Sequence, residues 1–351
     1  MLSIKKALPL AALAAAALLA AGCGNKGAKG QIKIGLSMDT LQTERWQHDR
    51  DAFTKRCAEL GAKVLVQVAN SNDALQNSQA DNLLTQGVSV LVVIPHNGKT
   101  AATIVDAAHK ANVPVLAYDR MIMDSDLDMY VSIDPVGVGR LQAEYLVKRR
   151  PKGRYVLIEG APTDNNAVLL RQGQMEVLKP YVDRGDIKIV GEQWAKDWQP
   201  VEALKIMENI LTRVGNKVDA VLASNDGTAG GAIQALGEQK LAGKVLVTGQ
   251  DADLAACQRI VEGTQDMTIY KSLTAEAYKA AEVAVAMAKK EPLPGNPSMI
   301  PNGKRDVPSI LLLPMAVDKA NLNETVIADG FQKMEEVYKN VPKDKWPAAK
   351  K

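Results

Sequence analysis

Short runs of β-branched and aliphatic residues alternate with longer amphipathic stretches from residue 31 onward. The first four runs are almost wholly apolar: Ile32–Met38, Lys63–Ala69, Val90–Pro95 and Val113–Tyr118. Such runs are typical of parallel strands that are covered on both faces. Between the first two, Phe53, Cys57 and Leu60 recur at helical spacing and Gly61 supplies a C-cap. Strand–helix–strand repetition predicts right-handed crossovers and a doubly wound sheet.

The same pattern begins again after Tyr130–Asp134. Further strands are predicted at Tyr155–Gly160, Ile187–Trp194, Ala220–Ser224, Val245–Gly249 and Met267–Lys271. Helices are expected to begin near Asn166, Pro200, Thr228 and Asp253. The sequence therefore predicts an α/β fold of two similar doubly wound lobes. A helix at 274–290 and a strand at 308–315 follow the second lobe, so they are expected to cross back and join the lobes.

The first thirty residues have the pattern of an export signal. Lys5 and Lys6 precede the apolar run Ala7–Ala21, which is too short to span a membrane as a helix. We therefore expect residues 1–22 to be a signal peptide and residues 23–30 a flexible tether. The sequence Leu19-Ala20-Ala21-Gly22-Cys23 resembles a lipobox, which implies lipidation of Cys23 and a membrane anchor in the periplasm. Cleavage near Ala21-Gly22 without lipidation is the alternative.

Length and charge narrow the function classes. The 351 residues suffice for two domains, and 46% apolar with 24% charged residues is typical of a globular protein. Loss of residues 1–22 removes two lysines and lowers the formal charge from +3 to +1. No basic surface for nucleic acid is therefore expected. Cys57 and Cys257 are predicted to be buried free thiols.

Polar and indole side chains follow nearly every predicted strand in both lobes. In open α/β sheets, ligands bind beyond the carboxyl ends of the strands. The candidate ligand-binding residues there are Arg45, Trp46, Asp119, Arg120, Asn166, Trp198, Asn225, Asp251 and Lys271. Sugar hydroxyls need both acceptors and donors, and an indole covers the apolar face of a sugar ring. This set of side chains favours a monosaccharide as ligand.

Each of these residues also has a structural interpretation. An Asp or Asn after a strand, such as Asn225, is often a helix N-cap or turn residue. A single Arg such as Arg120 is often in a surface ion pair, and a Trp at the end of an element is often core packing. Recurrence at the same topological position in both lobes favours a shared site.

Signals of catalysis are weak. His48, His96 and His109 do not pair with Cys or acids at metal-ligand spacing, and nucleophile-elbow and phosphate-loop motifs are absent from the sequence. A glycosidase would need an acid of raised pKa, whereas each candidate acid has a basic or amide neighbour in the sequence. We expect no enzyme activity, no metal and no cofactor.

Several of these segments together resemble the ribose-type periplasmic sugar-binding proteins. They are Glu44-Arg45-Trp46-Gln47, Ala117-Tyr118-Asp119-Arg120-Met121-Ile122, Asp164-Asn165-Asn166-Ala167, Gln193-Trp194 with Trp198, Ala223-Ser224-Asn225-Asp226, Gly249-Gln250-Asp251-Ala252-Asp253 and Tyr270-Lys271. The similarity covers residues 31–335 and is strongest to members of ABC importers that bind D-xylose.

The resemblance implies a type I periplasmic binding protein with a three-segment hinge and a sugar in the cleft. It implies that the polar candidates hydrogen-bond the sugar, while Trp46 and Trp198 cover its faces or its bare C5 edge. The implied partners are D-xylose or a related monosaccharide and an inner-membrane ABC permease, with the protein a monomer. Another pentose or hexose (ribose, arabinose, glucose) remains an alternative ligand. A sugar-responsive repressor would need an N-terminal helix-turn-helix where this chain has an export signal.

The expected lobes share the chain unequally. Residues 31–134 plus 273–297 are assigned to the N-terminal lobe, residues 135–272 plus 298–340 to the C-terminal lobe, and 341–351 to a tail. The hinge crossings are expected near Ile133–Val136, Ser272–Leu273 and Leu293–Asn302.

Overall fold

The computed structural model describes residues 31–347, which form two α/β lobes. The first lobe contains a seven-stranded sheet in the order β11-β12-β5-β4-β3-β1-β2, in which only β11 is antiparallel to its neighbour. Its strands are β1 (Ile32–Met38), β2 (Ala62–Val68), β3 (Val90–Val93), β4 (Val115–Tyr118), β5 (Met129–Ile133), β11 (Ser298–Pro301) and β12 (Asp306–Leu312).

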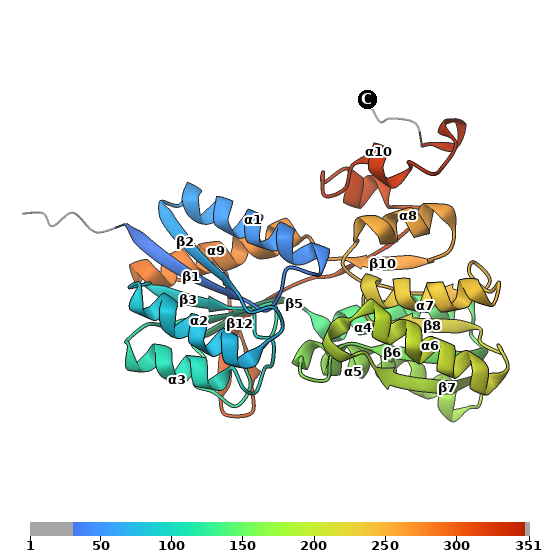
Figure 1. Ribbon diagram of the computed structural model, residues 1–351, viewed down its shortest axis with the longest axis horizontal. Helices are drawn as coiled ribbons and strands as arrows, with labels where there is room; N and C mark the ends of the chain where they lie inside the picture. Colours follow the sequence, from blue (N-terminus) through green and yellow to red (C-terminus); the bar gives the residue numbers. More distant parts are fainter. Residues whose placement is uncertain (1–30, 348–351) are drawn as a thin grey trace, which may run out of the picture. The chain divides into compact units, whose positions relative to one another are not determined.

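Both faces of this sheet are covered by helices, because alternate strand residues point to opposite sides. Leu36 and Val92 face a cluster that includes α1 (Glu44–Glu59) and α9 (Leu273–Lys289). Leu91 and Val93 face the opposite cluster with α2 (Asp73–Thr85) and α3 (Ala102–Lys110). Figure 1 shows α1 and α9 on one side of the strands and α2 and α3 on the other. The prediction of a doubly wound sheet is confirmed.

The second lobe repeats this plan. Its parallel sheet has the order β7-β6-β8-β9, formed by β6 (Gly153–Glu159), β7 (Ile187–Trp194), β8 (Ala220–Ala223) and β9 (Leu246–Val247). The chain after β9 runs beside β10 (Met267–Tyr270), where the Asp251 N–H donates to the Ile269 carbonyl at 2.9 Å. β10 in turn pairs with β13 (Met315–Asp318) in antiparallel fashion.

Helices also cover both faces of the second sheet. One face packs on α4 (Pro135–Arg149) and α5 (Asn165–Asp183), and the other on α6 (Pro200–Val214) and α7 (Asp226–Glu238). Gly139 and Gly173 let α4 and α5 approach backbone to backbone, since a Cβ on Gly139 would lie 1.9 Å from the Leu170 carbonyl oxygen. α8 (Leu254–Glu262) follows β9, and the short helix η1 (Lys196–Trp198) follows β7.

The chain passes between the sheets three times. It leaves the first sheet after β5, returns from β10 into α9, and leaves again between β12 and β13. The assignment of residues 298–340 to the C-terminal lobe, with a crossing at Leu293–Asn302, is therefore wrong for 298–312. These residues form β11 and β12, and β12 pairs with β5 of the first lobe. The physical reason is proximity, because α9 already packs on the first sheet and is joined to β11 by a short connection.

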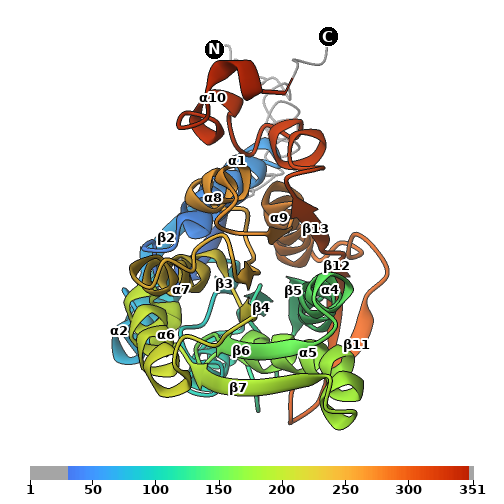
Figure 2. The same cartoon turned by 90° about the vertical axis from the view of Figure 1, so that its right-hand side faces the viewer.

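The segment after β13 packs on the second lobe. It contains η2 (Asn323–Ile327), α10 (Met334–Val337) and η3 (Lys343–Lys345), and its apolar side chains form a cluster with those of α8. Figure 2 shows α10 and α8 on the same side of the molecule. Cys57 and Cys257 are buried and free, as predicted. Between residues 31 and 347, no helix is long and apolar enough to cross a membrane.

Candidate functional site: a polar cavity between the lobes

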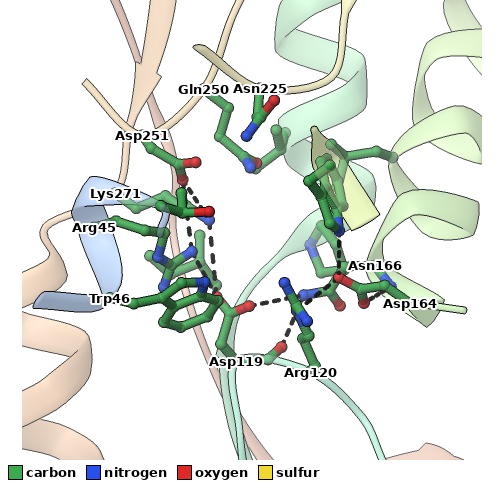
Figure 3. Close-up of a pocket in the computed structure, with 16 residues that line it drawn as sticks. Arg45, Trp46, Asp119, Arg120, Asp164, Asn166, Asn225, Gln250, Asp251 and Lys271 are labelled. Atoms are coloured by element: carbon green, nitrogen blue, oxygen red, sulfur yellow. Dashed lines mark hydrogen bonds and ion pairs between the residues drawn. The ribbon is translucent and has the colours of Figure 1, made fainter. Parts of the chain in front are cut away.

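One cavity is lined by all nine side chains that the sequence singles out. Its space outside atoms is about 470 Å³, counting its opening to solvent. Figure 3 shows the labelled residues pointing toward one another from segments far apart in the sequence. The nine are Arg45, Trp46, Asp119, Arg120, Asn166, Trp198, Asn225, Asp251 and Lys271. The site therefore lies at the carboxyl ends of strands from both sheets, as the topology predicts.

Trp46 forms the floor of the cavity on the first-lobe side. It lies in the first turn of α1 and is 2% exposed. The Arg45 guanidinium carbon lies 4.1 Å from the Trp46 ring centroid, and that of Arg120 lies 5.2 Å away. Both distances fit cation–π attraction. The indole is thus held as a flat apolar surface beside two fixed donors.

Arg45 is surrounded by carboxylates. Its Nε lies 3.2 Å from Asp49, its Nη1 2.9 Å from Asp119 and 3.5 Å from Asp251, and its Nη2 3.3 Å from Glu276. Burial alone would lower the pKa of Arg45, but the neighbouring acids raise that pKa well above its usual value. Arg45 is therefore a permanent cation whose orientation is fixed on several sides.

Asp119 is the acceptor at the centre of the first-lobe side. Burial would raise its pKa, but Arg45, Lys271 and Arg120 lower that pKa to about 2. Lys271, which follows β10 in the second lobe, lies 3.8 Å from Asp119 and 3.0 Å from Asp251. Asp119 is therefore ionised at neutral pH and accepts hydrogen bonds only.

Arg120 connects the two lobes. Its Nη1 lies 2.8 Å from Asp39 of the first lobe, and its Nε lies 2.8 Å from Asp164 of the second. Asn166 donates from Nδ2 to the Asp119 carbonyl at 2.8 Å, which is a second contact across the cleft. Arg120 is 6% exposed, so the alternative of a surface ion pair does not hold.

The second-lobe residues are oriented mainly by the backbone. Asn225 is the N-cap of α7 and forms a capping box with Thr228, so its structural interpretation also holds. Its Oδ1 accepts from the Thr228 N–H at 2.9 Å, which leaves the Nδ2 amide as the donor for a ligand. Asp251 has a φ of 103°, a conformation that L-residues rarely adopt.

Seven further lining residues were not predicted as site residues. They are Thr43, Ile133, Pro135, Val138, Asp164, Leu170 and Gln250. Asp164 and Gln250 are the near neighbours of Asn166 and Asp251 in the sequence, and adjacency was the signal that could have found them. Asp164 also caps α5, accepting from the Asn166 N–H at 2.9 Å, which is the structural role that its position suggested. The apolar members gave no signal, because the sequence alone does not separate them from core residues.

The charges of the lining residues balance. Arg45, Arg120 and Lys271 supply three cations, and Asp119, Asp164 and Asp251 supply three carboxylates. A neutral ligand with several hydroxyls suits such a cavity, because each hydroxyl can meet a charged donor or acceptor. Within the described part of the chain, no group of three or more His, Cys, Asp or Glu is placed to hold a metal.

The structure corrects one expectation about acids. Burial raises the pKa of Glu159 to about 8 and that of Asp226 to about 7, although no acid of raised pKa was expected. Neither residue lines the cavity. Burial also raises the pKa of Asp164, which does line it, but its carboxylate is paired with Arg120. Burial against the sheet, which neighbours in the sequence do not reveal, explains the difference.

The two lobes, their three connections and the cavity between them define the type I periplasmic binding protein fold. The chain belongs to the periplasmic binding protein domain family, which it matches over residues 34–292. The family places the protein in the periplasm and makes it a solute-binding protein, not an enzyme.

Several relatives are sugar-binding proteins. The chain is 54% identical over 307 residues to the D-xylose-binding periplasmic protein of Haemophilus influenzae, a match that covers 88% of this chain and 92% of that protein. Identity to the D-xylose-binding periplasmic protein of Escherichia coli is also 54%, with 88% and 93% covered. A carbohydrate transporter solute-binding protein from Chloroflexus aurantiacus, solved in complex with D-glucose, is 29% identical with a TM-score of 0.81, covering 86% of this chain and 97% of that one. Such proteins bind monosaccharides and work with ABC transporters.

Proposed function

We propose that this protein captures D-xylose in the cleft between its lobes and delivers it to an ABC permease in the inner membrane. One observation carries the proposal: charged, amide and indole side chains from both lobes surround one cavity of balanced charge. The likeness to two D-xylose-binding periplasmic proteins supports the choice of sugar.

In this proposal the sugar holds the lobes together. Arg45, Asp119 and Arg120 hydrogen-bond it from the first lobe, and Asn166, Asn225, Asp251 and Lys271 from the second. Trp46 and Trp198 cover its apolar surfaces. Because only the closed form offers both sets of contacts, the sugar shifts the equilibrium toward closure, and the permease recognises that state.

Calorimetry with D-xylose, ribose, arabinose and glucose tests the ligand. We expect D-xylose to bind at about 1 μM or tighter, which is about −8 kcal/mol, and to be recovered unchanged afterwards. Heat with ribose or glucose but none with D-xylose would assign the site to another monosaccharide.

A pair of variants tests the site. Asp119→Ala should lower D-xylose affinity at least a hundredfold, since it removes a buried ionised acceptor. Asp126→Ala is the matched control, because Asp126 pairs with Lys304 on the surface of the same lobe. Equal affinities for the two variants would contradict the proposed site.

Attachment and assembly complete the proposal. We propose that Cys23 is acylated and anchors a monomer to a membrane; Cys23 lies outside the described residues. Mass spectrometry of the mature N-terminus distinguishes an acylated Cys23 from cleavage near Ala21-Gly22. Light scattering of the mature protein tests the monomer.

A further inference from the structure

The indole of Trp198 rests directly on Gly160. A Cβ placed on Gly160 would lie 2.1, 2.3 and 2.4 Å from three atoms of the six-membered ring of Trp198. Gly160 follows β6, and Trp198 ends η1 after the neighbouring strand β7. The φ of Gly160 lies outside the left-handed range, so its backbone would accept any residue. Glycine is therefore needed at position 160 because of the Trp198 ring and not because of the backbone conformation.

Two contacts and the local backbone conformation hold the indole in place. Its Nε1 donates to Asp164 Oδ2 at 3.2 Å. Ile133, Val138 and Leu170 belong to the apolar cluster against which the ring packs. Asp197 and Trp198 have φ values of 51° and 59°, so the η1 backbone is held in the left-handed region. The ring therefore has little freedom to move aside within the closed structure.

We propose that Gly160 is a positioning residue that sets the depth of the Trp198 indole in the cavity. The proposal rests on the proposed function, in which Trp198 covers one surface of the sugar. An alanine at position 160 would push the ring by about 1.3 Å, the difference between 2.1 Å and ordinary contact at 3.4 Å. Since Trp198 also lines the cavity, displacing its ring changes the space that is left for a sugar ring.

Calorimetry on Gly160→Ala tests this role. We expect D-xylose affinity to fall at least tenfold, and the melting temperature of the sugar-free protein to fall as well, because the added Cβ must displace a ring that is held in place. Gly237→Ala is the matched control, because Gly237 lies in α7 of the same lobe and a Cβ there meets nothing within 4 Å. Gly237→Ala should bind like wild type.

A variant that lacks the Trp198 ring separates a positioning role of Gly160 from a general structural defect. In Trp198→Leu, which removes the ring, adding Gly160→Ala should change the affinity by less than twofold. A tenfold loss from Gly160→Ala in that background, or no loss in the wild-type background, overturns the proposal.

A crystal structure of Gly160→Ala tests the proposal without sugar. A displaced indole is the expected result, and an indole in its present position overturns the proposal. Failure of the proposed function would look different, since the wild-type protein itself would then not bind D-xylose.

Discussion

The two lobes hold their ligand-facing side chains in different ways. In the first lobe, Arg45 forms ion pairs with the buried carboxylates of Asp49 and Glu276, and Arg120 forms one with that of Asp39. In the second lobe, Asn225 is held by a helix cap. Asp251 and Trp198 there are held by left-handed backbone conformations. Left-handed backbone also occurs in the first lobe, at Asp119, and an ion pair in the second, between Lys271 and Asp251. The difference is that the arginines of the first lobe are held by a buried charge network, whereas Asn225 and Trp198 of the second lobe depend on main-chain geometry.

Because of this difference, we expect mutations in the two lobes to affect stability and binding affinity in different ways. A buried charge network couples stability to binding, because removing one member leaves its partners buried and unpaired. A side chain oriented by a cap can lose its ligand-facing atom while the cap survives. Mutations in the first lobe should therefore change stability and affinity together, and those in the second lobe can separate the two.

The largest effect is expected at Arg45. Arg45→Met leaves Asp49 and Glu276 without their cation and removes one of the cations near Asp119. We therefore expect the free energy of unfolding to fall by about 3–5 kcal/mol and D-xylose binding to be lost. Urea unfolding and calorimetry measure the two effects. Arg140→Met, at an exposed pair with Glu176, should leave both unchanged. An Arg45→Met protein as stable as wild type would remove the basis of the comparison.

A smaller effect is expected at Asn225, where the loss of affinity can be separated from the loss of stability. Asn225→Asp keeps the oxygen that caps α7 but removes the amide donor, so stability should hold while affinity falls about tenfold. Asn225→Ala should lose the same affinity and about 1 kcal/mol of stability. Asn72→Ala, at the cap of α2 away from the cavity, should lose stability alone. Wild-type affinity in Asn225→Asp would contradict the expectation that a second-lobe mutation can lower affinity without lowering stability.

The smallest effect is a pH dependence at His96. Its Nδ1 lies 2.9 Å from Asp39, which also binds Arg120, and its Nε2 lies 3.9 Å from Asp73 and from Asp197. The hydrogen bond with Asp39, together with Asp73 and Asp197, raises the pKa of His96. Asp197 belongs to the second lobe, so closure adds part of that effect and takes up protons.

D-xylose affinity should therefore be highest below the raised pKa of His96 and fall about twofold as pH rises through it. Calorimetry between pH 5.5 and 8.5 measures this change. His96→Gln should remove it, whereas His109→Gln should not, since His109 pairs with Asp128 inside the first lobe. Persistence of the slope in His96→Gln would place its origin elsewhere.

The sequence predicted which side chains meet at the cavity better than it predicted the route of the chain. Strand ends are local signals, and parallel strands bring their carboxyl ends to one edge, so the pattern alone could place Asp119 and Asn166 together. The sequence did not indicate which residues orient these side chains. Glu276 lies 231 residues from Arg45, and only the packing of α9 on α1 brings the two side chains together.

The assignment of β11 and β12 failed for a related reason. Their apolar pattern predicts a strand but does not say which sheet edge it joins, because pairing is decided by non-local hydrogen bonds. The position of α9 carried the missing information. A helix already packed on the first sheet leaves its short continuation within reach of the same sheet.

The return of α9 and β12 to the first sheet has a consequence for folding during export. Ala280 and Val283 of α9 cover one face of that sheet, and β12 covers the edge of β5. These residues emerge from the translocation machinery only after β6 to β10 and α4 to α8 of the second lobe have passed through it. A nascent chain that ends before residue 273 therefore exposes a bare apolar sheet face, whereas its second lobe already holds α4 to α8.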